Sequence, residues 1–218
     1  MIYDRADSCV TRVTPDMIRW EMLLDTRVIH LTGITPPLSP SCADVVTAII
    51  TPAPAERGVA ISFDINYRAR LWTEAQAREW LTPAIHGVEL LLCGQADARR
   101  IFGIEGTPEH VVKALAEMSG AKQVVVSLGE QGAVGWDGAN VYRQPALPVR
   151  IIDRIGAGDA LAAGVLHGWF DGNLELGLRY GVALAALALS QHGDAVITTP
   201  RELESLLAQT HGGSTVLR

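Results

Sequence analysis

The sequence predicts an α/β protein built on a largely parallel β-sheet. One observation indicates this fold class, and a second indicates a globular chain with a core. Short apolar runs alternate with amphipathic segments along the chain, which is the pattern of successive βα units. The chain has 218 residues, of which 48% are hydrophobic and 19% charged, so it is long enough for a sizeable core and differs from disordered sequences. The sequence shows no repeat and no linker, and we expect a single domain over residues 1–218.

The expected strands are short apolar runs followed by turn residues. They are residues 27–31, 59–64, 88–93 and 124–128, then a hairpin that turns at Asp137 and Gly138, and a further apolar strand at Ile151 and Ile152. Residues 3–19 are polar and irregular, and no strand is expected there.

The expected helices are residues 43–50, 73–80, 97–102, 108–118, 174–190 and 200–207, together with one that follows Gly158. Thr73 is a typical N-cap with Glu74 in the first turn, and Pro108 is suited to the start of a helix. Pro52 and Pro54 end the first helix, because proline cannot continue it.

The segment Gly156-Ala157-Gly158-Asp159 predicts an anion site at the start of a helix. Glycines let successive N–H groups converge, and the helix adds unpaired N–H groups and the positive end of its dipole. The alternative is that the glycines only turn the chain and Asp159 caps the helix. A carboxylate beside a phosphate site is explained better if it accepts a proton from a group that attacks the phosphate. We therefore expect phosphoryl transfer to a hydroxyl.

The run Asp153-x-x-Gly156-Ala157-Gly158-Asp159 resembles the signature of the ribokinase-like (PfkB) carbohydrate kinases, and residues 153–160 are similar to the form found in 2-keto-3-deoxygluconate kinases. The resemblance implies a three-layer α/β/α fold. It implies ATP-dependent phosphorylation of the terminal hydroxyl of a small sugar acid, with 2-keto-3-deoxygluconate as the first candidate. Another sugar kinase, such as a fructokinase, and a catalytically silent nucleotide-binding remnant remain as alternatives.

The resemblance also assigns roles to individual residues. Asp159 is expected to be the general base, and the amides of Gly156, Ala157 and Gly158 to form the anion hole. The residues expected to bind the nucleotide are Ser127, Gly129, Gly132, Gln191, Gly193 and Asp97. The residues expected to contact the substrate are Asp64, Asn66, Arg68, Tyr3, Arg5, Gly33 and Ile34. The first three match the Asp-x-Asn-x-Arg motif of 2-keto-3-deoxygluconate and fructose kinases, and Arg68 suits a carboxylate or phosphate.

One departure concerns the metal. Where the family usually carries Asn-x-x-Glu, this sequence has Gly94-Gln95-Ala96-Asp97. The expected cofactors are ATP and Mg²⁺, with no protein side chain binding the metal directly and Asp97 acting through water. The resemblance also allows a monovalent cation.

The resemblance covers the C-terminal two-thirds of the family's length. The first strands of the family's sheet and most of its β lid, which closes over the sugar and pairs subunits, are therefore expected to be missing. This leaves both a monomer and a homo-oligomer open.

The composition excludes several kinds of partner. The net charge of −6 without a basic cluster argues against nucleic acid, and no apolar run is long enough to span a membrane. The three cysteines (Cys9, Cys42 and Cys93) are far apart without metal-ligand spacing, as expected for free thiols in the cytoplasm.

Overall fold

The computed structural model describes residues 8–51 and 57–210. Contacts divide the chain into two compact units, which we call unit 1 (residues 1–124) and unit 2 (residues 125–218). The strands follow one another in the sheet in the order β1-β2-β3-β4-β5-β6. The predicted α/β fold with a mostly parallel sheet is confirmed, and the expectation of a single domain remains a prediction.

Unit 1 contains three parallel strands, β1 (Val28–Thr32), β2 (Ala60–Asp64) and β3 (Leu90–Gly94). The register places Ile29 opposite Ile61, and Phe63 opposite Leu91. These four side chains are buried, which is typical of strands in a parallel sheet that is covered on its faces. Because the strands are parallel, the residues that follow them in the chain gather at one edge of the sheet.

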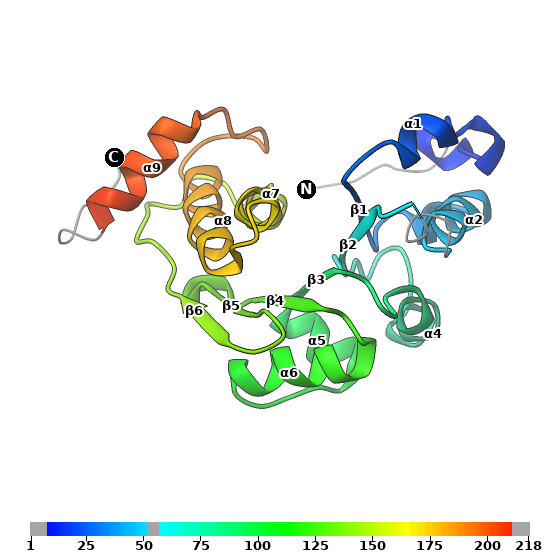
Figure 1. The fold of residues 1–218 in the computed structure, drawn as a ribbon, viewed down its shortest axis with the longest axis horizontal. Coiled ribbons are helices and arrows are strands. Elements are labelled where there is room, and N and C mark those ends of the chain that lie inside the picture. The colour runs from blue at the N-terminus through cyan, green and yellow to red at the C-terminus, as the bar shows by residue number, and fades with distance from the viewer. Residues whose placement is uncertain (1–7, 52–56, 211–218) are drawn as a thin grey trace. The chain divides into compact units, whose positions relative to one another are not determined.

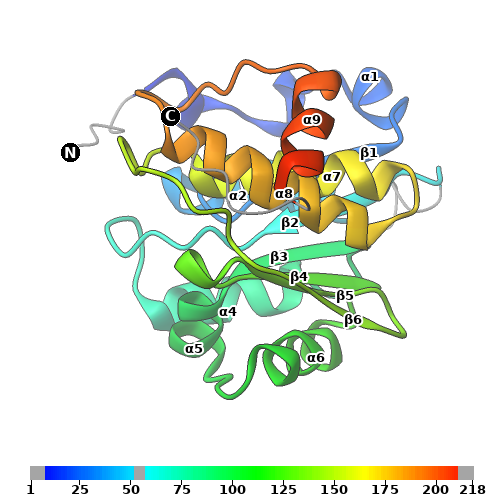
Figure 2. The same ribbon diagram turned by 90° about the vertical axis from the view of Figure 1, so that its left-hand side faces the viewer.

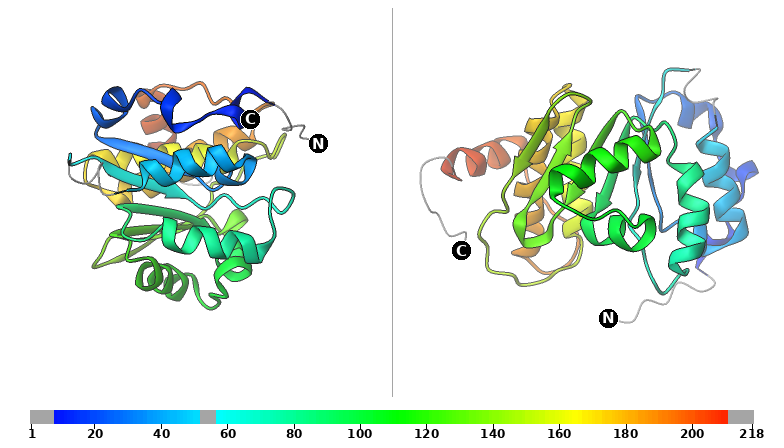
Figure 3. Two further views of the ribbon diagram at one scale, coloured as in Figure 1. Left: turned by 90° about the vertical axis from the view of Figure 1, so that its right-hand side faces the viewer. Right: turned by 90° about the horizontal axis from the view of Figure 1, so that it is seen from below.

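The α-helices of unit 1 are α1 (Trp20–Leu24), α2 (Pro40–Ile49), α4 (Glu74–Ala84), α5 (Gln95–Phe102) and α6 (Pro108–Ser119). Short 3₁₀ helices cover Cys9–Arg12, Pro15–Met17 and Pro36–Leu38. The predicted cap of α4 is confirmed: Thr73 accepts a hydrogen bond from Gln76 N at 3.3 Å, and Gln76 Oε1 accepts one from Thr73 N at 2.9 Å. Figure 3 shows α4, α5 and α6 lying next to one another.

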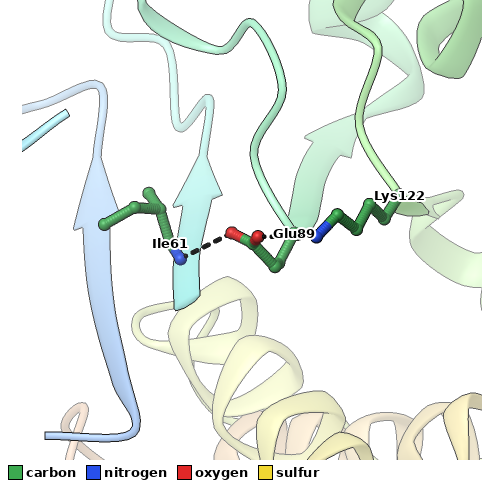
Figure 4. A network of polar contacts seen from close by, with 3 residues as sticks. All are labelled: Ile61, Glu89 and Lys122. Carbon is green, nitrogen blue, oxygen red and sulfur yellow. Dashed lines mark hydrogen bonds and ion pairs between the residues drawn. The ribbon is translucent and has the colours of Figure 1, made fainter. Parts of the chain in front are cut away.

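A carboxylate links the amino ends of β2 and β3 (Figure 4). Glu89 Oε2 accepts a hydrogen bond from the N–H of Ile61 at 2.9 Å, and its Oε1 lies 3.0 Å from Lys122 Nζ. The N–H of Glu89 in turn donates to the carbonyl of Ile61 at 3.0 Å. Glu89 therefore fixes the alignment of two strands on the side opposite to the ends that carry the predicted functional residues.

The strand β4 (Gln123–Ser127) crosses the boundary between the units and is followed in unit 2 by β5 (Ala133–Trp136) and β6 (Val141–Gln144). The last two form the predicted antiparallel hairpin. In its turn, Asp137 Oδ1 accepts hydrogen bonds from Ala139 N at 2.9 Å and Asn140 N at 2.7 Å. The backbone N–H of Asn140 is the main reason why the pKa of Asp137 falls to about 2.

The helices of unit 2 are α7 (Ala157–Phe170), α8 (Leu174–Leu189) and α9 (Pro200–Thr210). Figures 1 and 2 show α8 beside α7, with α9 beside α8. Glycines allow α7 and α8 to approach backbone to backbone: a Cβ at Gly164 would lie 2.5 Å from the Cα of Gly181. Tyr180 and Ala183 of α8 also pack in one buried cluster with leucines of α9. Of the helices in the described residues, none has the length and hydropathy to cross a bilayer.

Most predicted boundaries lie within a few residues of the observed ones, but three expectations are wrong. Ile151 and Ile152 are not in a strand; the N–H of Ile152 donates to the carbonyl of Leu189 at 2.8 Å, and both side chains are partly exposed. The first long helix begins at Pro40, because Ser39 accepts a hydrogen bond from Cys42 N and caps it. The helix α4 continues beyond Trp80 to Ala84.

Candidate active site

The start of α7 in unit 2 has the backbone geometry predicted for an anion site. Gly156 precedes the helix with φ of 77°, and a Cβ there would lie 2.9 Å from the Cα of Asp194, so the position requires glycine. Within residues 8–51 and 57–210, the first main-chain hydrogen bond donated from this turn runs from Ala160 N to Gly156 O at 2.8 Å. The amides of Ala157 and Gly158 precede it without a main-chain acceptor in those ranges, as the first turn of a helix dictates.

Asp153 fixes the loop that leads into α7. Its Oδ1 accepts a hydrogen bond from Ile155 N at 3.2 Å, and its Oδ2 accepts one from Gly193 N at 3.4 Å. The hydrogen bond from Ile155, followed by that from Gly193, lowers the pKa of Asp153. The sequence analysis gave Asp153 no separate role. The available signal was an Asp two residues before a turn, which commonly accepts a hydrogen bond from the backbone there.

Asp159 lies in the first turn of α7, directly after Gly158. Its side chain is exposed and not turned into the protein interior. A carboxylate in this position is accessible to a hydroxyl group of a bound molecule. The carboxylate of Asp159 thus directly follows two amides that have no main-chain acceptor in the described residues. Their roles as anion site and base remain predictions.

A pocket of about 720 Å³ opens beside this turn, lined entirely by residues of unit 2. Ala157 and Gly158 contribute to its wall, together with three of the residues predicted to bind nucleotide: Ser127, Gly129 and Gly132. Much of the remaining lining is apolar and comes from the segment after β6, from α7 and from α8. Its residues are Ala146, Leu147, Pro148, Val149, Ile151, Leu161, Val182, Ala185, Ala186 and Leu189. A volume and lining of this kind suit a small ligand with one apolar and one anionic end.

Gln191 and Gly193, which were also expected at the nucleotide, are not among the residues that line this pocket. Gln191 Nε2 donates to the carbonyl of Ala195 at 2.8 Å, and Gly193 donates to Asp153. Both residues thus hold the loop after α8 in place. Their contact with a nucleotide remains a prediction.

In unit 1, the predicted Asp-x-Asn-x-Arg motif forms a turn directly after β2. Asp64 Oδ1 accepts a hydrogen bond from Asn66 N at 3.1 Å, and Asn66 has φ of 39°, in a region that few residues other than glycine and asparagine adopt. The N–H of Ile65 donates to the carbonyl of Leu92 at 2.9 Å, which anchors the turn to β3. Arg68 is exposed, and its Nη1 donates to the carbonyl of Tyr67 at 3.1 Å.

Asp97, in the first turn of α5, contacts the same segment. Its carboxylate accepts a hydrogen bond from the backbone N–H of Tyr67. Burial raises the pKa of Asp97, while this hydrogen bond and the positive charges of Arg68 and Arg100 oppose the increase. The structure therefore brings Asp97 to the predicted substrate motif. In the described residues there is no group of three His, Cys, Asp or Glu side chains that could hold a metal ion.

Gly33 and Ile34 follow β1 at the same edge of the sheet. The N–H of Gly33 donates to the carbonyl of Asp64 at 2.8 Å, and a Cβ on Gly33 would collide with the carbonyl oxygen of Ile65. Gly33 is thus required for close packing against the motif, whether or not it also contacts substrate. The N–H of Ile34 donates to Thr32 Oγ1 at 3.3 Å. Tyr3 and Arg5 lie outside the described residues.

Comparison with known proteins decides the family. Residues 1–200 match the model of the pfkB family carbohydrate kinases. The chain belongs to this family. Its relatives include a 2-dehydro-3-deoxygalactonokinase of Haloferax volcanii, 35% identical over 95% of the chain, and a 2-dehydro-3-deoxygluconokinase of Thermoproteus tenax, 32% identical over 95% of the chain. A solved 2-dehydro-3-deoxygluconokinase of Thermotoga maritima has a TM-score of 0.87 and 26% identity over 95% of the chain.

This pfkB family chain spans 65% and 63% of the lengths of the first two relatives and 68% of the solved structure. The agreement in fold with the solved structure confirms the ribokinase-like architecture expected from the sequence.

Proposed function

We propose that the protein is an ATP-dependent kinase that phosphorylates the terminal hydroxyl of a 2-dehydro-3-deoxy sugar acid, either the gluconate or the galactonate. The observation that carries the proposal is the start of α7. There, Ala157 and Gly158 line a pocket of suitable size for a nucleotide, their amides have no main-chain acceptor in the described residues, and the exposed carboxylate of Asp159 follows them. The names of the relatives support the class of substrate.

In the proposed reaction, the oxygen of the sugar's terminal hydroxyl attacks the γ-phosphorus of ATP, and the bond from that phosphorus to ADP breaks. Asp159 accepts the hydroxyl proton. The amides at the start of α7 donate hydrogen bonds to the negative charge on the transferred group. Such a transition state depends mostly on positioning and charge stabilisation, so a weakly basic carboxylate is sufficient.

Unit 1 is proposed to recognise the sugar acid. Arg68 is exposed at the end of the turn after β2, and its planar guanidinium suits the C1 carboxylate of the substrate. Asp97 and Gly33 hold the motif that carries Arg68, through the N–H of Tyr67 and the carbonyl of Asp64. Substrate selectivity therefore depends on this turn.

A solved protein of Escherichia coli, which shares the fold with a TM-score of 0.83 and 23% identity, is described as a complex with ATP and Mg²⁺. This supports the same cofactors for the proposed reaction. Mg²⁺, when bound, neutralises charge on the phosphate oxygens and keeps much of its water. That Asp97 acts through this water remains a prediction from the sequence. A monovalent cation remains a prediction.

The decisive experiment is Asp159→Asn. We expect the variant to fold and bind ATP as the wild type does, while its turnover falls by about 10²-fold or more. Asp171→Asn is the matched control, because Asp171 is an exposed carboxylate at the opposite end of the same helix. Turnover of Asp159→Asn within a few-fold of the control would contradict the assignment of the base.

Arg68→Ala tests the substrate class. If Arg68 binds the carboxylate, the variant loses catalytic efficiency with sugar acids and retains it with neutral sugars such as fructose. An equal loss with both kinds of sugar would contradict the role of Arg68. Binding of ATP without phosphorylation of any sugar by the wild type would instead identify a silent nucleotide-binding protein.

A further inference from the structure

Two charged side chains line the pocket of unit 2, and the proposed function uses neither of them. Arg154 Nη2 lies 3.8 Å from Glu130 Oε1, and the two side chains are 74% and 85% exposed. An ion pair at this distance and exposure is weak, since water screens it and both side chains lose freedom when they form it. Either side chain can therefore leave the ion pair and bind another group at little cost in free energy.

The backbone that carries Arg154 is fixed on both sides. Asp153 before it is bound to the N–H groups of Ile155 and Gly193, and Gly156 after it packs closely against Asp194. Arg154 therefore lines the pocket from a loop held by these contacts, and Ala157 and Gly158 line the same pocket. Among the described residues that line this pocket, Arg154 is the only one with a positive charge.

We propose that Arg154 is a binding residue for the polyphosphate of the nucleotide, and that Glu130 occupies its guanidinium when no nucleotide is bound. This inference rests on the proposed function and extends it to a residue that distinguishes nucleotides from nucleosides. The planar fork of arginine suits two phosphate oxygens, and a polyphosphate carries more negative charge than one carboxylate. Glu130 and the phosphates would bind the same guanidinium, so Glu130 competes with them for Arg154 and weakens nucleotide binding.

The test is calorimetric titration of the full chain with ATP and with adenosine. We expect Arg154→Gln to weaken ATP binding by about tenfold and to leave adenosine binding unchanged, because only ATP carries phosphates. Glu130→Gln should tighten ATP binding by about two- to fivefold. In the double variant, the gain from Glu130→Gln should disappear, because the cation for which Glu130 competes is gone. Arg150→Gln, an exposed arginine of the same segment that does not line the pocket, is the matched control.

Three results would overturn the inference. If Arg154→Gln binds ATP as tightly as the control does, Arg154 does not contact phosphate, and the proposed function is unaffected. If Arg154→Gln weakens the binding of ATP and of adenosine equally, Arg154 only supports the shape of the pocket. A thermal melt of the variant would then reveal a lower melting temperature. If the wild type binds neither ligand, both the inference and the proposed nucleotide site are wrong.

Discussion

The contact between α7 and α8 allows a quantitative test of the structure. A Cβ added at Gly164 would lie 2.5 Å from the Cα of Gly181 and from the carbonyl carbon of Tyr180. Carbon atoms pack at about 3.5–4.0 Å, so Gly164→Ala must push the two helices apart by about 1 Å. Both obstacles are backbone atoms, which cannot rotate away, and the cost therefore lies near the upper end of the usual range, at about 3 kcal/mol.

Alanine also favours the helix over glycine by about 1 kcal/mol, which leaves a net loss of about 2 kcal/mol for Gly164→Ala. Gly158→Ala is the matched control, because it is the same exchange in the same helix with no atom within 4 Å of the new Cβ. Its free energy of unfolding should be unchanged or higher by up to about 1 kcal/mol.

Urea denaturation followed by circular dichroism measures both variants. We expect the midpoint of Gly164→Ala to fall and that of Gly158→Ala to stay or rise. If Gly164→Ala were as stable as the control, the helices would not be in backbone contact and the reasoning would be refuted. Gly158→Ala should in addition bind ATP more weakly, since its methyl group enters the wall of the proposed phosphate site.

Three further predictions concern single residues. Glu89→Ala should lower the free energy of unfolding by about 1–3 kcal/mol, because the N–H of Ile61 loses its acceptor. Lys122→Ala removes only the exposed ion pair and should lower it by less than about 1 kcal/mol. Equal losses for the two variants in urea denaturation would contradict the role of Glu89. The pKa of Asp137 is lowered from 3.8 to about 2, so its contribution is complete above pH 3.8 and is lost as the pH falls through about 2. After allowance for solvent screening this amounts to about 1 kcal/mol, and Asp137→Asn should remove that part of the acid dependence of unfolding. Gly33→Ala should weaken sugar-acid binding and spare ATP binding, as paired titrations would show, because the new methyl group displaces the turn after β2.

Local signals in the sequence were sufficient for most elements. The cap at Thr73, the proline at the start of α6 and the turn at Asp137 act within a few residues, and each appears where it was predicted. The strand predicted at Ile151 and Ile152 does not form, for a physical reason. Apolar runs predict strands only when a neighbouring strand supplies hydrogen bonds, and here the N–H of Ile152 bonds to the carbonyl at the end of α8.

The candidate site likewise combines features that the sequence shows with contacts that only the fold shows. The sequence located the turn before α7 and the motif after β2, since each is a short contiguous pattern. It could not show that Asp153 joins the loop before α7 to Gly193, forty residues later, or that Asp97 accepts the N–H of Tyr67. Such contacts are invisible in a single sequence, because they join segments that only the fold brings together.

The sequence alone therefore determined the α/β class, the glycine pattern before α7 that we propose binds phosphate, and the resemblance to sugar kinases, because these depend on residues that are close in the chain. Tertiary structure decided which loops fix the site, which residues line the nucleotide-sized pocket and that Arg154 and Glu130 face each other there. The reason is that these properties depend on distances between side chains far apart in sequence, which packing sets.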